Sequence, residues 1–232
     1  MRLPIIYNLD KGLSNGTTSS IKGILTSANL ISASFLGVFC LTCDRLAQTA
    51  ACRRNRVFAA LLDNFTHGII GSWTWAVVLG GNLNSTKNLR QIILAGILAS
   101  CMDVDHFLAA RSIHLKDATS LQQRPLFHMT TLIPVIAIIS EIIICASGLH
   151  RLHYFPYLFT LSWFSHHIRD ATRRGLWLWP FGSTPPVPYG MYIGLTLVLP
   201  FLIAILMSIT GSPIHAVELH RVLHRVGGIQ QV

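Results

Sequence analysis

The sequence predicts an all-α protein, a multi-pass transmembrane helical bundle of about six spans. Hydrophobic residues fill 51% of its 232 positions and charged residues only 12%, well below the roughly 25% of a soluble domain. The apolar residues are concentrated in stretches of about 17 to 25, the length that crosses a bilayer as a helix. The connections between these stretches are short, which favours one compact bundle over two domains.

Six apolar stretches define the expected spans. In chain order they lie near Ile24 to Cys43, Val57 to Gly80, Gln91 to Ala110, Leu126 to Gly148, Leu152 to Ile168 and Pro188 to Thr210. We therefore expect a polar N-terminal segment at residues 1–23, a transmembrane helical domain at 24–210, and a basic, histidine-containing tail at 211–232. The whole chain is expected to be an integral, multi-pass protein of a lipid bilayer.

The segments around the spans fit this arrangement. The first 22 residues lack the basic stretch, short apolar core and cleavage site of a secretory signal, so the first span is expected to insert as an uncleaved anchor. The STPPVP segment at 183–188 breaks the helix before the last span. Trp177, Trp179 and Phe181 precede it and are expected to anchor this connection at the membrane interface.

Charge and cysteine content disfavour two other classes of protein. The net charge of +9 lies mostly in short loops beside apolar spans, where basic residues set topology and meet anionic head groups, so nucleic-acid binding is not expected. The five cysteines are odd in number and mostly inside the spans, which fits neither a disulfide framework nor a four-thiolate zinc site. Cys40 and Cys43 form a CxxC by chance spacing within an apolar helix.

Acidic residues are the informative anomaly. The chain has only nine, and six of them lie in or at the ends of the proposed spans: Asp44, Asp63, Asp103, Asp105, Glu141 and Asp170. An ionisable group in hydrocarbon costs at least about 2.5 kcal/mol, so such residues normally face a bundle interior, pair with one another or bind an ion.

The polar residues of the spans gather beside the first, third and fifth connections. In an alternating six-span topology these connections share one side, so the polar groups converge at one membrane face. Asp63 and His67 are four residues apart, as are His166 and Asp170, and each pair therefore shares one helical face. The converging residues are Asp44, Asp63, His67, Asp103, Asp105, His106, Arg124, His128, His166, His167 and Asp170.

Imidazole and carboxylate groups in such a cluster suit a divalent metal ion such as zinc, manganese or iron. Not every member needs to be a ligand, because Asp63 could orient His67 by accepting its second ring proton. Asp105 would point away from the cluster unless the helix ends or unwinds near Met102. With open coordination positions, a metal here could activate water and polarise a phosphoryl or carbonyl oxygen.

A purely structural reading stays open, because a His/Asp pair in a span also forms as an internal hydrogen bond between helices. Glu141, Asp44 and His167 are left outside the ligand set. His167 and Arg169 are expected to project differently from His166 and to face the loop or the head groups.

Four blocks of sequence together resemble the YdjM-like family of inner-membrane proteins, described as membrane-bound metal-dependent hydrolases. The blocks are DNFTHGIIG (63–71), MDVDH (102–106), RPLFH (124–128) and SHHIRDATRRG with the later WPF (165–181). Their order and the S-H-x-x-x-D spacing match a family pattern of T-H, P-D-x-D, R-G-x-T-H-S and S-H-x-x-x-D. The likeness covers about 120 residues.

The resemblance implies a set of roles. It implies metal-site roles for His67, Asp103, Asp105, His128, His166 and Asp170, with Arg124 as an anion contact. From the residues and the resemblance together, we expect Asp105 to be a metal ligand or a general base. Zinc or manganese is the expected ion. Four family positions differ, which removes hydroxyls that could support a substrate: Met102, Pro125, Phe127 and Met129.

Two functions follow, from different classes. The first is a membrane-embedded metal-dependent hydrolase of a phosphoester or lipid. The alternative is a non-enzymatic membrane protein, a structural scaffold or an ion- or proton-handling protein, that keeps the same polar cluster. Ten Lys and Arg residues on the side of the cluster, against eight on the other, favour a cytosolic site, and sequons at Asn15 and Asn84 lie on the opposite side.

Overall fold

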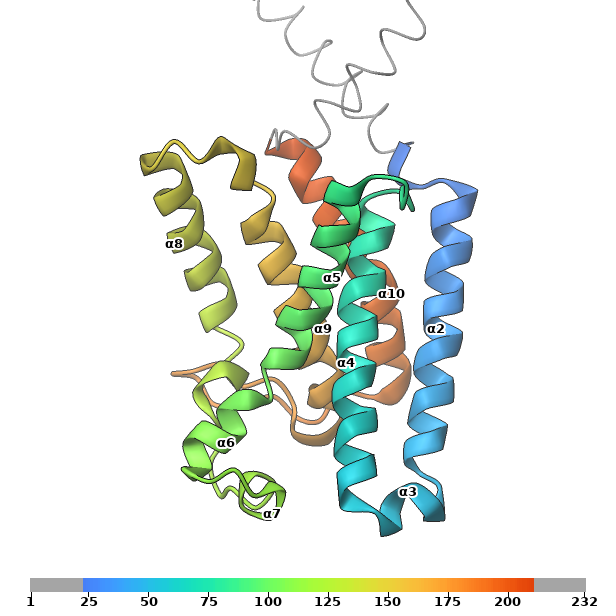
Figure 1. The fold of residues 1–232 in the computed structure, drawn as a ribbon, viewed down its shortest axis with the longest axis vertical. Coiled ribbons are helices and arrows are strands. Elements are labelled where there is room, and N and C mark those ends of the chain that lie inside the picture. Colours follow the sequence, from blue (N-terminus) through green and yellow to red (C-terminus); the bar gives the residue numbers. More distant parts are fainter. Residues whose placement is uncertain (1–22, 211–232) are drawn as a thin grey trace, which may run out of the picture.

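The apolar stretches of the sequence form helices that run alternately up and down, side by side (Figure 1). The structure is a computed structural model that describes residues 23–210, and the all-α prediction is confirmed across that range. The long helices are α2 (Ser27–Ala47), α4 (Arg56–Val78), α5 (Thr86–Cys101), α8 (Leu132–Ala146), α9 (Phe155–Arg174) and α10 (Tyr189–Ile209). Short helices connect them: α3 (Ala50–Arg54), α6 (Val104–Ala110), α7 (Leu115–Ala118), η1 (Leu126–His128) and η2 (His150–Leu152).

Side-chain caps set several of the helix starts. The Thr26 and Thr49 hydroxyls accept backbone N–H groups in the first turns of α2 and α3, and the Asn55 amide oxygen does the same for α4. Pro156 lies in the first turn of α9, where its missing N–H costs nothing. Gly175, with a positive φ of 70°, ends α9.

Fewer helices than expected are both long and apolar enough to cross a membrane. Among the described residues three stretches meet both conditions: Ser27–Ala47, Thr86–Ala110 and Tyr189–Ile209. The expectation of six spans is thus supported for only half of them. Helix α8 is apolar but has 15 residues, whereas α4 and α9 are long enough but carry the polar residues of the candidate site.

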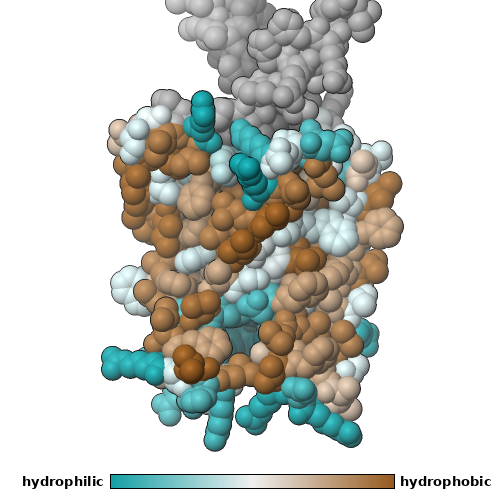
Figure 2. Space-filling model, in the orientation of Figure 1, coloured by the Kyte–Doolittle hydropathy of each residue, from teal (hydrophilic) through white to brown (hydrophobic). Residues whose placement is uncertain are grey.

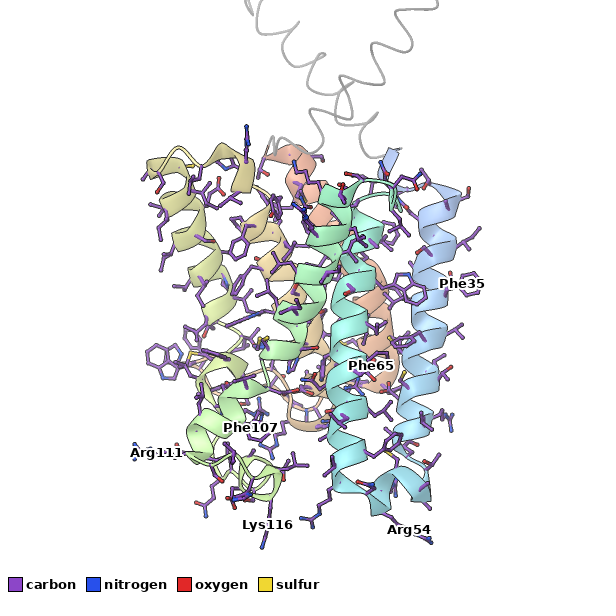
Figure 3. The ribbon with its side chains drawn as sticks, viewed as in Figure 1. Phe35, Arg54, Phe65, Phe107, Arg111 and Lys116 are labelled. Carbon is purple, nitrogen blue, oxygen red and sulfur yellow. The ribbon has the colours of Figure 1, made fainter. Side chains whose placement is uncertain are left out.

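Helix α9 can be polar because it is the central helix. It packs against α4, α5, α8 and α10, and twelve of its twenty residues are buried. Outward-facing side chains elsewhere are apolar, as on α2, where Phe35 is 61% exposed and points away from the bundle (Figure 3). The surface in Figure 2 is accordingly dominated by hydrophobic residues, as expected of a protein surrounded by lipid.

Small residues let α4 and α5 approach each other closely. A Cβ added at Gly71 would lie 2.6 Å from Ala99 Cβ and 2.9 Å from Ala95 O, and one added at Gly96 would lie 2.8 Å from Gly68 O. Small-residue contacts of this kind are a main source of helix association in membranes. The expected polar N-terminal segment, up to residue 22, and the tail at 211–232 lie outside the described residues.

Gly71→Ala should destabilise the bundle, because the new methyl group forces α4 and α5 apart. Overpacking typically costs about 1–3 kcal/mol of unfolding free energy. Thermal unfolding of the detergent-purified protein would measure this. Gly194→Ala on α10 is the control, because a Cβ there meets nothing within 4 Å. Equal melting temperatures for both variants would contradict a tight α4–α5 contact.

Candidate metal centre

The polar residues of the spans meet at one end of the bundle, the lower end in Figure 1, where the connections between α2 and α4, α6 and α8, and α9 and α10 lie. Each part of the candidate site comes from a different element. Helix α4 supplies Asp63 and His67, the break between α5 and α6 supplies Asp103, η1 supplies His128, and α9 supplies His166 and Asp170. The convergence predicted from alternating topology is what the structure shows.

Four residues form the tightest group, here called the four-residue cluster: Asp103, His128, His166 and Asp170. Each offers one ligand atom, and these atoms all lie within 4.8 Å of one another. His166 Nε2 lies 3.4 Å from His128 Nε2, 3.3 Å from Asp170 Oδ2 and 3.6 Å from Asp103 Oδ1. These are four of the five residues predicted as metal ligands.

The spacing suits a tetrahedral ion. Two ligand atoms that are each about 2.0–2.1 Å from a tetrahedral zinc ion lie about 3.3–3.4 Å apart. The two Nε2 atoms of the cluster are 3.4 Å apart, and Asp170 Oδ2 is 3.5 Å from His128 Nε2. The donor set, two imidazoles and two carboxylates, is also one that zinc or manganese accepts.

The rings of both histidines are held so that Nε2 points into the cluster. His166 Nδ1 lies 2.9 Å from Ala99 O, and because a carbonyl can only accept, Nδ1 carries the proton and Nε2 carries a lone pair. His128 Nδ1 lies 3.4 Å from the Asp105 carboxylate, which also accepts the backbone N–H of Phe127. Partners of this kind orient the histidines of metal sites.

The electrostatics of the cluster favour a cation. Burial by itself would lower the pKa of His128, but hydrogen bonds to Asp105 and Asp170 outweigh it and raise that pKa to about 9. The carboxylates of Asp105 and Asp170 therefore surround His128 with negative charge, which a bound cation would also offset.

A break in the helix gives Asp103 and Asp105 their positions. Helix α5 ends at Cys101 and α6 begins at Val104, so the condition set for Asp105, an end or unwinding near Met102, is met. Asp103 therefore faces the cluster, and Asp105, 4% exposed, reaches His128 from behind. A continuous helix would have separated the two side chains.

His67 lies beside the four-residue cluster rather than in it. Its ring stacks on that of His166, with centroids 3.8 Å apart, and its Nε2 lies 3.5 Å from Asp170 Oδ1. His67, Asp63 and Asp170 could form a second metal group. Arg169 Nη1 lies within that group, because it donates to Asp63 Oδ1 and lies 3.1 Å from His67 Nε2.

The expectation for Arg169 was wrong. Its side chain does not face the loop or the head groups but is buried, 3% exposed, and pairs with Asp63 and Asp44. Asp63 consequently accepts hydrogen bonds from Arg169 and Arg173 instead of orienting His67. One sequence signal could have placed Arg169 on the buried face of α9. It follows Ser162 and His166 at intervals of four and then three residues, the spacing of one helical face.

His167 was also misplaced, since it is buried at 4% exposure and hydrogen-bonds to Phe127 O and Thr130 Oγ1. It therefore ties α9 to the segment that carries His128. Glu141 lies near the other end of the bundle, away from the four-residue cluster; it pairs with His153 at 2.7 Å and forms a separate candidate metal group with His153 and Cys145. His106, on α6, meets His128 edge to face, and its Nδ1 lies 3.2 Å from Ala118 O.

The resemblance implies that Arg124 contacts an anion. In the structure its hydrogen-bond partners are backbone carbonyl groups instead. Its guanidinium donates to the carbonyl oxygens of Arg174 and Gly175, the last carbonyls of α9. Arginine at this position satisfies carbonyls that have no partner within the helix. Arg124 thus fixes the end of α9, four residues after Asp170.

A cavity of about 870 Å³ opens onto the four-residue cluster. Asp103, His128 and Asp170 line it, together with His106 from α6. Figure 2 shows the corresponding hollow between α4 and α6, with hydrophilic residues in its depth and hydrophobic residues around it. An ion held by the cluster would therefore be in contact with the cavity.

Known proteins give the chain a family but not a chemistry. It is 41% identical to transmembrane protein 267 of Mus musculus over 84% of this chain and 90% of the relative. The proteins of the same name from Xenopus laevis and Danio rerio are 40% and 39% identical, over 81% of this chain and 86% and 84% of their own lengths. No family model matches the chain, and no solved structure gives a significant match. The chain belongs to the transmembrane protein 267 family, and it is a membrane protein.

Arg169→Met should destabilise the protein far more than Arg173→Met. Arg169 is buried and is the cation that neutralises Asp44, so its loss should cost about 3–5 kcal/mol of unfolding free energy. Arg173 also pairs with Asp63 but is 56% exposed, and an exposed pair is worth roughly 0–1 kcal/mol. Thermal unfolding of the two purified variants would compare them. Equal losses would show that the buried network does not hold the helices together.

Proposed function

We propose that this chain is a membrane-embedded hydrolase that holds one divalent metal ion, zinc or manganese, and cleaves a phosphoester or lipid. The observation that carries the proposal is the cavity, because three of the four clustered donors line it. A buried polar cluster that served packing alone would have no need of a cavity beside it. The tetrahedral spacing favours zinc over manganese.

In this proposal Asp103, His128, His166 and Asp170 hold the ion. When bound there, it would supply a water of lowered pKa and would polarise the oxygen of a substrate ester. His67 supports His166 through ring stacking rather than by ligation, because Arg169 already contacts its Nε2. Asp105 acts through His128, whose ring it orients.

Hydrolysis also needs a group that accepts a proton from water and returns it to the leaving alcohol. In the overall balance the water oxygen bonds to the phosphorus or carbonyl carbon, the ester bond breaks, and one water proton passes to the alcohol. His106 is suited to this role. Its Nδ1 lies 3.2 Å from Ala118 O, to which it can donate, and the residue lines the cavity beside His128. In the neutral ring, Nε2 would then be the atom that accepts a proton.

We further propose the six-span topology with the site at the cytosolic face, and a transmembrane domain over residues 24–210. Helices α4 and α9 have 23 and 20 residues, about 34 and 30 Å, and lie among the three apolar helices. Their polar groups face one another, so they need not be apolar overall. The basic residues, ten on the side of the site against eight, support the orientation.

A relation to the YdjM-like family is part of the same proposal. Residues from all four matching blocks, distant in sequence, meet at the cluster or directly beside it: His67, Asp103, His128, His166 and Asp170. Shared blocks that converge on one site support common ancestry more than scattered matches would. Fold alone would not establish a shared reaction.

Purified protein should contain one zinc or manganese ion per chain. One ion is expected. The group of Asp105, His106 and His128 shares His128 with the four-residue cluster, and Arg169 occupies the group of Asp63, His67 and Asp170. The group of Glu141, Cys145 and His153 lies apart from the cavity, and there Glu141 pairs with His153. Mass spectrometry of metal content would show the ion in wild type and its loss in His166→Ala and Asp103→Asn. His114→Ala, at an exposed position away from the cluster, should keep it. Metal-free wild type, purified without chelator, would contradict the proposal and support a structural role for the cluster.

His106→Gln should separate catalysis from metal binding. Loss of a proton-transfer group typically lowers turnover by about 10²–10⁴-fold. We expect that loss in phosphoester hydrolysis, at unchanged metal content. A variant that lost its metal as well would make His106 a ligand instead.

A further inference from the structure

The arginines around the cavity divide into two sets. Arg173 is paired with Asp63, and Arg124 is committed to the carbonyls at the end of α9. Three others line the cavity with no acidic partner within the described part of the chain: Arg53, Arg56 and Arg174. Guanidinium groups in such a position are suited to phosphate, which they can bind through two parallel hydrogen bonds.

The acidic residues of the cavity do not offer a place for a cationic head group. Its acidic lining residues are Asp63, Asp103 and Asp170. Asp103 and Asp170 belong to the four-residue cluster, and two arginines neutralise Asp63. The cavity therefore favours a ligand whose charge is negative and carries no compensating amine.

The wall on the lipid side is apolar. Val57 and Leu61 of α4 are 58% and 64% exposed and line the cavity, as does Phe107 of α6. Ala60, on the same wall, leaves room between them. The hollow in Figure 2 lies on the side of the bundle, with hydrophobic residues around it. A ligand with acyl chains could enter there without passing through water.

The site lies close to one end of the proposed spans, just inside the head-group region of a bilayer. Asp63 lies seven residues from the start of α4, about 10 Å along the axis, and Asp170 lies four residues before the end of α9, about 6 Å. Basic side chains, among them Arg54, Arg111 and Lys116, extend from this end of the bundle (Figure 3). Phosphates and ester groups of lipids lie at the level of the helix ends, where Arg53, Arg56 and Arg174 are placed.

We propose that the cavity binds an anionic phospholipid, of the type of phosphatidic acid, which enters sideways between α4 and α6. Its phosphate lies against Arg53, Arg56 and Arg174, and its acyl chains leave along Val57, Leu61 and Phe107. The inference rests on the proposed function for the chemistry, and it names the substrate class of that site.

Native mass spectrometry of the full chain in detergent can test the ligand. We expect phosphatidic acid to bind one to one, at least ten-fold more tightly than phosphatidylcholine, which adds a cationic group. Glycerol 3-phosphate, which has the same phosphate without acyl chains, should also bind at least ten-fold more weakly. Equal affinity for glycerol 3-phosphate would overturn the lipid in favour of a soluble phosphoester.

Two variants should each lower phosphatidic acid affinity at least ten-fold. Arg53→Gln/Arg56→Gln/Arg174→Gln removes the phosphate contacts, and Ala60→Trp fills the entrance without changing charge. The control, Lys87→Gln/Arg90→Gln/Arg151→Gln, removes the same charge from the opposite end of the bundle and should bind as wild type does. Wild-type affinity in either cavity variant, or an equal loss in the control, would overturn the inference.

Metal content and phosphoester hydrolysis, measured on the same samples, keep the two proposals apart. Phosphatidic acid binding without metal or turnover would leave the ligand assignment standing and end the hydrolase. Bound metal and turnover of soluble phosphoesters, without lipid binding, would support the hydrolase and overturn the lipid assignment.

Discussion

The cost of placing charge in a low-dielectric interior is the constraint on which this structure depends. Arg169 is buried between the helices near one end of the bundle, and it is tolerated because Asp44 of α2 and Asp63 of α4 pair with it. These pairs fix α9 against two other helices at the depth of the four-residue cluster. His67 and Asp170 lie beside these ion pairs. The pairing that neutralises Arg169 therefore also fixes the part of the candidate site that His67 and Asp170 form.

Much of the site could be predicted from the sequence, because charged residues are scarce there. Two signals identified the four-residue cluster: the free-energy cost of ionisable side chains in hydrocarbon, and the sequence blocks shared with the YdjM-like family. An alternating topology was enough to bring the four residues to one end of the bundle. His128 needed the block, since a lone histidine near a loop carries little signal. The all-α class followed from apolar content and the length of the stretches.

What escaped prediction depends on which residues face each other across helices. A hydropathy pattern cannot tell that α9 is covered by four helices, so it could not show that Arg169 and His167 are buried. For the same reason the sequence could not show that the guanidinium of Arg169 lies among Asp63, His67 and Asp170. The sequence analysis could say only that Asp105 would join the site if the helix ended near Met102. It could not predict the break between α5 and α6, because Met102 is not a residue that marks a helix end.

Four protein ligands would ordinarily describe a closed, structural metal site, whereas catalytic sites leave one position open. The two carboxylates of the cluster differ from its histidines in a way that bears on this point. His166 is fully buried and fixed by a backbone carbonyl, but Asp103 and Asp170 are each about a quarter exposed on the cavity side. Asp103 also sits at the helix break, and its side-chain contacts are long: Asn64 Nδ2 lies at 3.5 Å, His166 Nε2 at 3.6 Å and His128 Nε2 at 3.8 Å. A carboxylate ligand at such a position can give way to water more easily than a histidine can. The arrangement therefore combines a buried imidazole half with a partly exposed carboxylate half that faces the cavity, and this is the division that the proposed hydrolase would need.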